Sequence, residues 1–558
     1  MELFVIAIGG TGMRCLESFI HMCAIGMYDN RTINILTLDT DKTNGNLQRV
    51  EELIDLYQKI KSEKENGIDG GSPNVDTFFS AKLNLYKFCT DYSDQARSSY
   101  STLTHLAQGK EETQQNSDLS SLFLDPDTVQ KFDLQYGYRA QTHLGSLLMY
   151  QGIIEAARHA AENGDAASIR EKSLKAFVER LQQNQEQARV FVFGSVFGGT
   201  GASSIPVIPK ALQEVAHICL NGQTINFSKA KFGSTLLTYY FQFGKADETQ
   251  MKEDLVVADS NNFALNSQVA LQFYQSDPTV KNTYKRFYHV GWPSSKRLDV
   301  SNGKGKTIVG GQEQRNNCHV AELLCASAAY DFFTLSDDDL NNEVVDCLYR
   351  SAKCDDGIFS FTGSDFVSQG AVFESKLGAF LSLAHIVLSR CNAAWSQKEE
   401  DGIRSLLKGC KDRNKEEYYA AFSSNQARNI DDYMRLFAYQ FKGSDIVKGW
   451  IYQIYDSLKP GKFIFSSEAF TSQRAMMDKF SAGRLFDDPR HNWSEMKAAL
   501  GVFGSKRDNS YDILLNTIAT NESAKPDKER QKAKTLKEQF IAHVYNAIAL
   551  SQKFNNQK

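Results

Sequence analysis

Residues 190–206 read VFVFGSVFGGTGASSIP, an apolar run that leads into a turn rich in glycine and threonine. Residues 190–193 predict a buried parallel strand, because a short apolar run bounded by glycine suits a sheet that is covered on both faces. The turn that follows can approach an anion closely, since its glycines have no Cβ in the way. Pro206 suits the first turn of the next helix, where the N–H that proline lacks would have had no partner.

The order of strand, glycine turn and helix predicts a phosphate site. At such a helix start, free backbone N–H groups and the helix dipole face the bound anion. The hydroxyls of Thr200 and Ser203 would add donors. The residues expected to contact phosphate are Gly198, Gly199, Thr200, Gly201, Ala202 and Ser203.

The chain opens with a second element of the same kind. Residues 3–8 form an apolar run, a GGTG turn follows, and residues 13–22 place apolar side chains at helical spacing. One GGTG turn is weak evidence, whereas two such turns on one sheet favour a phosphate site. The residues of this first turn are Gly9, Gly10, Thr11 and Gly12.

A third apolar run, residues 33–38, ends at Asp39 and Asp41. These carboxylates are expected at the carboxyl ends of the strands, where ligands of open α/β sheets bind. Asp39 would also suit the ribose of a dinucleotide if the first glycine turn acted alone. An NAD-dependent oxidoreductase is therefore an alternative, although the chain shows no substrate-domain signal to support it.

The order of these elements resembles the GTP-binding domain of the tubulin/FtsZ superfamily. Residues 198–206 align without a gap with the family's GGTGTGAAPVV, although Phe197 replaces its first glycine and Ser203 its last. Residues 136–145, YGYRAQTHLG, resemble the loop that covers the γ-phosphate and imply charge compensation by Arg139, with a simple exposed arginine as the alternative. FQFGK at 241–245 is similar to the family's PFNFEGK near the ribose.

The resemblance implies a GTP-binding domain over residues 1–333, and the total of 558 residues predicts at least one further domain. Residues 45–135 are too many for a bare connection and predict a helical insertion. Residues 334–558 predict a mainly helical C-terminal domain, in which only residues 462–466 suggest a strand. The family's second domain mixes helices with a sheet, so this region departs from it.

The resemblance also implies a central helix over residues 314–333, with helical spacing from residue 316. A side chain in its first turn should meet the base, and Asn317 has the donor and acceptor that guanine recognition needs. An asparagine at a helix start is equally suited to be a cap.

In this family an acidic loop after the central helix reaches the nucleotide of the next subunit and orients the attacking water. Asp338, within an acidic triplet, and Asp365, in a GSDF context, are the two candidates, and Asp365 is preferred narrowly. For both, helix capping and a favourable position near a helix dipole are the alternatives.

The composition excludes several other classes of protein. A net charge of −4 gives no general attraction to nucleic acid. No apolar run approaches the roughly 20 residues that span a bilayer, so no membrane insertion is expected. The ten cysteines include no CxxC pair and predict reduced thiols in a cytoplasmic protein without a metal site.

The sequence thus predicts an α/β nucleotide-binding fold with a parallel sheet. The function implied by the resemblance is binding and slow hydrolysis of GTP to GDP, with Mg²⁺ bridging phosphate oxygens near Asp39 or Asp41. ATP remains an alternative nucleotide. Head-to-tail self-association is expected with this function. The second hypothesis is a nucleotide-gated scaffold that binds GTP without turnover and holds a partner protein through its helical C-terminal half.

Overall fold

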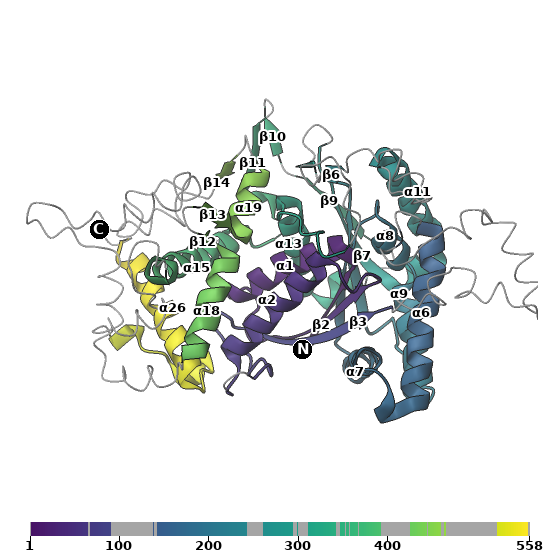
Figure 1. Cartoon of the computed structure of the whole chain (residues 1–558), viewed down its shortest axis with the longest axis horizontal. Coiled ribbons are helices and arrows are strands. Elements are labelled where there is room, and N and C mark those ends of the chain that lie inside the picture. Colours follow the sequence, from purple (N-terminus) through teal and green to yellow (C-terminus); the bar gives the residue numbers. More distant parts are fainter. Residues whose placement is uncertain are drawn as a thin grey trace, which may run out of the picture.

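The computed structural model centres on a seven-stranded parallel sheet (Figure 1). Its strand order is β3-β2-β1-β4-β5-β7-β9, and every neighbouring pair is parallel. The strands are β1 (Glu2–Ile8), β2 (Thr32–Asp39), β3 (Lys82–Cys89), β4 (Arg189–Phe193), β5 (Lys231–Leu237), β7 (Tyr284–Val290) and β9 (Asp346–Arg350). The predicted α/β class is therefore confirmed.

The structure describes most of the first half of the chain and separate stretches of the second half. The described residues are 2–64, 67–90, 138, 142–242, 260–293, 298–299, 311–341, 346–351, 353–355, 358–366, 368–391, 424–442, 445–458, 462–464 and 522–555.

Strand β1 shows how the apolar runs of the sequence produce a sheet with two covered faces. Consecutive side chains of a strand point to opposite faces. Leu3 and Val5 belong to one buried cluster, whereas Phe4 and Ile6 belong to another on the opposite face. An uninterrupted apolar run is therefore required, because neither face of β1 meets water.

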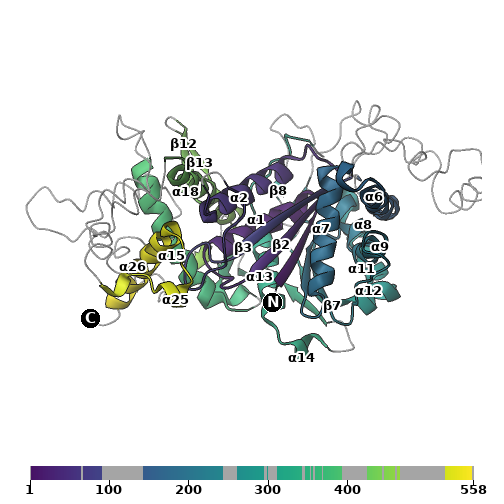
Figure 2. The same cartoon turned by 90° about the horizontal axis from the view of Figure 1, so that it is seen from below.

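Helices form a layer on each face of the sheet, as Figure 2 shows. One layer contains α1 (Gly9–Ala24), α2 (Gly45–Lys61) and α13 (Val320–Thr334). The other layer contains α6 (Thr142–Asn163), α7 (Ile169–Asn184), α8 (Gly199–Ser204), α9 (Ile208–Cys219), α11 (Phe263–Ser276) and α12 (Pro278–Thr283).

The C-terminal half packs on the layer formed by α1, α2 and α13. Its helices are α15 (Gly370–Cys391), α18 (Ser424–Phe437), α19 (Trp450–Ser457) and α26 (Leu536–Asn555). Buried side chains of all four belong to the same apolar cluster as one face of the sheet, which we call the shared core. No described helix in either half is long and apolar enough to cross a membrane.

Short strands interrupt the predicted helical regions. Residues 82–89, inside the expected insertion, form the edge strand β3, and β9 extends the main sheet beyond residue 333. The other short strands are β6 (Phe241–Gln242), β8 (Leu298–Asp299), β10 (Lys353–Asp355), β11 (Ile358–Thr362), β12 (Tyr439–Lys442), β13 (Asp445–Lys448) and β14 (Lys462–Ile464). The strand predicted at 462–466 is thus confirmed in part, while residues 392–423 and 465–521 of the predicted helical half lie outside the described residues.

His21 marks the contact between α1 and the C-terminal half. Its ring lies against Trp450, with ring centroids 4.7 Å apart, and its Nδ1 is 3.1 Å from the Tyr433 hydroxyl. The Trp450 indole N–H donates to the Ser18 hydroxyl at 2.9 Å. Burial, with a smaller effect from the charge of Arg49, lowers the pKa of His21 well below its ordinary value. Burial also lowers the pKa of His319.

We expect the protein to lose stability as the pH falls below about 6.5, because histidines of the unfolded chain then bind protons, whereas the buried imidazoles of the folded protein stay neutral. Each buried histidine can contribute a slope of up to about 1.4 kcal/mol per pH unit. His21→Gln should make the slope shallower between pH 7 and 5.5 in urea unfolding followed by circular dichroism. Equal slopes for the two proteins would contradict a neutral buried His21, since other titrating groups are common to both.

Candidate functional site

The two glycine turns lie side by side at the carboxyl edge of the sheet. β1 and β4 are neighbours, with Ala7 opposite Phe193, and each strand leads directly into its turn. The order of the strands reverses here, since β2 and β3 lie on one side and β5, β7 and β9 on the other. Ligands of open α/β sheets bind at such a switch point. A Cβ added to Gly9 would lie 3.2 Å from the Thr200 Cβ, so the two turns are in contact.

The first turn brings α1 unusually close to the sheet. α1 begins at Gly9, within the turn, and not after it as the sequence predicted. A Cβ on Gly12 would lie 2.6 Å from the Phe193 carbonyl oxygen, so this approach requires glycine. Among the described residues, no side chain caps the start of α1. The first N–H groups of this helix, including those of Gly10 and Thr11, are therefore directed at the switch point without a capping side chain.

The second turn has the same construction. α8 begins at Gly199, and its N-cap residue, Gly198, has no side chain with which to cap it. A Cβ added to Gly201 would lie 2.9 Å from the backbone nitrogen of Ser195, so this glycine lets the turn fold back on the end of β4. Thr200 is half-buried between the two turns.

The structure places two residues of this second turn differently from what the sequence suggests. Ser203 is fully buried and its hydroxyl donates to the Thr200 carbonyl at 3.0 Å, so it is already used within the helix. Pro206 lies in the turn between α8 and α9, because the helix starts earlier than predicted. Ala202 is buried as well, and its carbonyl accepts a hydrogen bond from the Tyr274 hydroxyl.

Asp39 has a carboxylate oxygen left for a ligand. The residue is 3% exposed, and its Oδ1 accepts from the N–H of Thr40 at 2.7 Å. Its Oδ2 has no hydrogen-bond partner among the described residues. Burial and the charge of Asp41 raise the pKa of Asp39 to about 7, although the backbone N–H donors lower it. Asp41 differs, because its Oδ1 accepts from Thr43 at 2.9 Å and its Oδ2 from Gly311 at 2.7 Å.

The residues before α13 lie across the loop that follows β2. We call residues 311–319 the crossing segment. Gln314 accepts a hydrogen bond from the Asn44 side chain at 2.5 Å, and a Cβ on Gly10 would lie 3.5 Å from the same Gln314 oxygen. The crossing segment therefore borders the first glycine turn and forms one side of the site.

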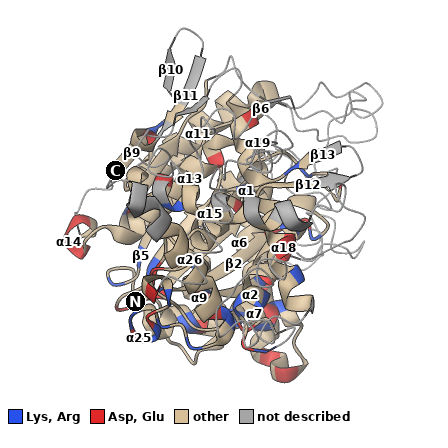
Figure 3. Cartoon of the chain, turned by 90° about the vertical axis from the view of Figure 1, so that its left-hand side faces the viewer, with Lys and Arg blue, Asp and Glu red and all other residues tan. Residues whose placement is uncertain are grey.

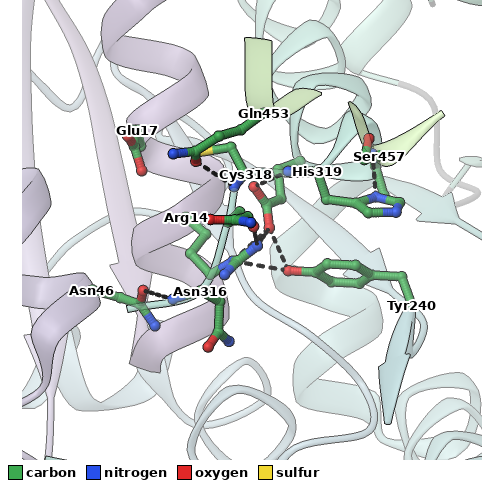
Figure 4. Close-up of polar contacts among 12 residues, drawn as sticks. Arg14, Glu17, Asn46, Tyr240, Asn316, Cys318, His319, Gln453 and Ser457 are labelled. Carbon is green, nitrogen blue, oxygen red and sulfur yellow. Dashed lines mark hydrogen bonds and ion pairs between the residues drawn. The ribbon is translucent and has the colours of Figure 1, made fainter. Parts of the chain in front are cut away.

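A buried polar cluster lies one helical turn below Gly10 on α1 (Figure 4). Arg14 Nε donates to Glu322 Oε1 at 2.5 Å, and the Tyr240 hydroxyl donates to the same oxygen at 2.5 Å. Arg14 also donates to the Asn317 carbonyl. Burial raises the pKa of Glu322, and the positive charge of Arg14 reverses part of that rise. The cluster thus joins α1 to the crossing segment and α13.

Helix α13 begins at Val320, so the predicted start at residue 314 or 316 was wrong. His319 is the N-cap: its Nδ1 accepts from the N–H of Ala321, and Glu322 reaches back to the N–H of His319. Asn317 lies three residues before the helix and its side chain is exposed. The expectation that Asn317 occupies the first turn is therefore incorrect.

The two candidate acidic residues lie in different environments. Asp338 is exposed in the short helix α14 (Asp337–Leu340), which is drawn in red at the margin of Figure 3. Asp337 pairs at 2.9 Å with Arg189 at the start of β4, so α14 lies at the amino edge of the sheet, opposite the glycine turns. Asp365 is 4% exposed in a 3₁₀ turn, Gly363–Asp365. Arg139 lies outside the described residues.

Sequence reasoning missed the cluster around Arg14. The available signal was a charged side chain four residues after Gly10 in a mainly apolar helix, which is the spacing of one helix face. Its partner Glu322 lies 308 residues away along the chain, so the pairing itself could not be anticipated.

No protein-family model matches this chain, and no curated protein matches it in sequence. The functional assignment therefore depends on the geometry of the site.

Proposed function

We propose that this chain binds GTP between its two glycine turns and hydrolyses it slowly in head-to-tail assemblies, as a divergent member of the tubulin/FtsZ superfamily. The observation that carries the proposal is the contact of Gly9 with Thr200, which joins two uncapped helix starts at the switch point. Backbone N–H groups from two helices can thereby surround one chain of phosphates.

Asp39 fits a role near Mg²⁺. Magnesium is commonly held by one or two carboxylates together with phosphate oxygens and water, so a single free carboxylate oxygen suffices. The Oδ2 of Asp39 is buried beside the first turn without a partner in the described part of the chain. Bound Mg²⁺ would neutralise charge on the phosphates, while Asp39 holds it through that oxygen or through water.

Hydrolysis of this kind depends on positioning and charge stabilisation more than on a nucleophilic side chain. A water-orienting carboxylate supplied by a neighbour is compatible with the site, because the glycine turns and α14 lie at opposite edges of the sheet. A contact between such opposite surfaces repeats from subunit to subunit. Asp338 is exposed at that edge, whereas the carboxylate of Asp365 is buried, so we now favour Asp338 for this role.

The nucleotide that the purified protein retains tests the proposal most directly. We expect the protein to release GTP or GDP when it is denatured, and chromatography identifies the nucleotide. We also expect the rate of phosphate release per subunit to rise with protein concentration. Asp338→Asn should leave GTP binding intact and lower turnover by at least about tenfold, since the water would lose its orienting group. Asp365→Asn is the matched control.

Three outcomes distinguish the alternatives. If the purified protein retains NAD or ATP, then that molecule is the ligand and GTP is not. GTP binding without turnover at any concentration would favour the nucleotide-gated scaffold, which holds a partner protein. Turnover that is independent of concentration would contradict the head-to-tail arrangement.

A further inference from the structure

The C-terminal half supplies hydrogen-bond acceptors to the start of α13. The N–H of Cys318 donates to Gln453 Oε1 at 2.8 Å, and the N–H of Val320 donates to the Ser457 hydroxyl at 3.0 Å (Figure 4). Gln453 and Ser457 both belong to α19. The first N–H groups of a helix have no partner within that helix, so these acceptors decide how the start of α13 is held.

Arg49 of α2 ties the same place to α1. Its guanidinium donates to Glu17 at 2.9 Å, to the Asn316 carbonyl at 3.1 Å and to Gln453 Oε1 at 3.4 Å. Gln453 Oε1 therefore accepts from the N–H of Cys318 in the crossing segment and from Arg49, which also donates to the Asn316 carbonyl of that segment.

The other side of the crossing segment lies against the candidate site. The N–H of Asn316 donates to Asn46 Oδ1 at 3.3 Å, in the first turn of α2. A Cβ on Gly10 would lie 3.5 Å from Nδ2 of the same Asn46 side chain. Residues 311–319 are thus held between the glycine turn on one side and α19 on the other. Displacement of α19 would take the acceptors away from the N–H groups of Cys318 and Val320.

We propose that Gln453 and Ser457 are positioning residues for the nucleotide site, through which docking of the C-terminal half sets nucleotide affinity. The inference rests on the proposed function. Coupling of this kind is reciprocal, so bound GTP should in turn hold α19 more firmly against α13.

Two substitutions of one residue separate positioning from mere packing. Gln453→Leu keeps the approximate volume and removes the acceptor, whereas Gln453→Glu keeps an acceptor oxygen for both Cys318 and Arg49. Both variants lose the donor to the Lys448 carbonyl at 2.6 Å, so a difference between them reports on the acceptor. Asp456→Asn is the control, because it weakens the 2.5 Å pair that this residue of α19 makes with Lys448 of β13. Near-ultraviolet circular dichroism confirms that each full-length variant is folded.

We expect Gln453→Leu to weaken GTP binding about tenfold, because the buried N–H of Cys318 loses its acceptor and Arg49 loses one of its contacts. Without nucleotide, it should also accelerate amide hydrogen exchange at Cys318. Gln453→Glu and Asp456→Asn should leave both measurements near those of the unchanged protein. In the unchanged protein, added GTP should slow exchange in α19.

The two proposals fail in different ways. If Gln453→Leu accelerates exchange at Cys318 but leaves GTP affinity unchanged, the crossing segment does not set affinity and the inference is overturned, while GTP binding stands. Unchanged exchange in the same variant overturns it as well, because the acceptor then does not hold the segment. If the unchanged protein binds no GTP, the proposed function fails, and this inference fails with it.

Discussion

Gly201→Ala should lose its bound nucleotide and remain folded. The added Cβ would lie 2.9 Å from the backbone nitrogen of Ser195 and 3.0 Å from its carbonyl oxygen. Backbone atoms cannot move aside as a flexible side chain can, so the second glycine turn must shift relative to the first. Because a misplacement of about 1 Å costs roughly 100-fold in a positioned site, we expect an affinity loss of about that size, measured by equilibrium dialysis with GTP.

Gly164→Ala provides the matched control for this prediction. Gly164 has φ of +50° and no atom within 4 Å of an added Cβ, so alanine there strains the backbone without a clash. It lies just beyond the far end of α6, roughly 30 Å along that helix from the glycine turns. We expect the control to retain its nucleotide. Equal affinities for the unchanged protein and a folded Gly201→Ala would refute the assignment of the phosphate site.

Arg14→Met should lower the free energy of unfolding by about 3–5 kcal/mol, the usual result of leaving one member of a buried ion pair without its partner. Arg14 is 3% exposed and Glu322 fully buried, so water cannot replace the lost cation. The remaining donors to Glu322 are the Tyr240 hydroxyl and the N–H of His319. Urea unfolding measures the loss.

The double variant Arg14→Met, Glu322→Gln is the control for charge. It removes both members of the ion pair, and we expect it to recover most of the stability that the single variant loses. A loss below about 1 kcal/mol in Arg14→Met would mean that Glu322 is already protonated in the folded protein. That result would be consistent with the rise that burial produces in its pKa.

The sequence predicted the centre of the sheet because those strands are buried on both faces. Apolar runs at β1, β2 and β4 fit a sheet that is covered on both faces, which is the environment that such runs predict. The two glycine turns were also predictable, since their glycines are required by close backbone approach and not by a distant partner. The residue at which each helix begins within these turns was not predictable, because a helix can start on a glycine without any capping side chain.

The edges of the sheet were missed for a physical reason. β3 (KLNLYKFC) carries lysine and tyrosine at partly exposed positions, and β9 (DCLYR) is short and carries a charge at each end. Edge strands of this composition resemble helix or loop sequences, and only pairing with β2 and β7 makes them strands. The start of α13 was missed because histidine is an uncommon N-cap, so His319 gave no signal.

The shared core makes the half of the chain that carries the glycine turns inseparable from the C-terminal half. Trp450, Tyr433 and Phe380 of the C-terminal half are buried in the cluster that also contains Leu16 and Phe19 of α1. A fragment that ended near residue 333 would present this apolar face to water, and large exposed patches of that kind promote aggregation. The two halves must therefore be inherited together, and a relative that retained the glycine turns without the C-terminal helices would need a different cover for α1.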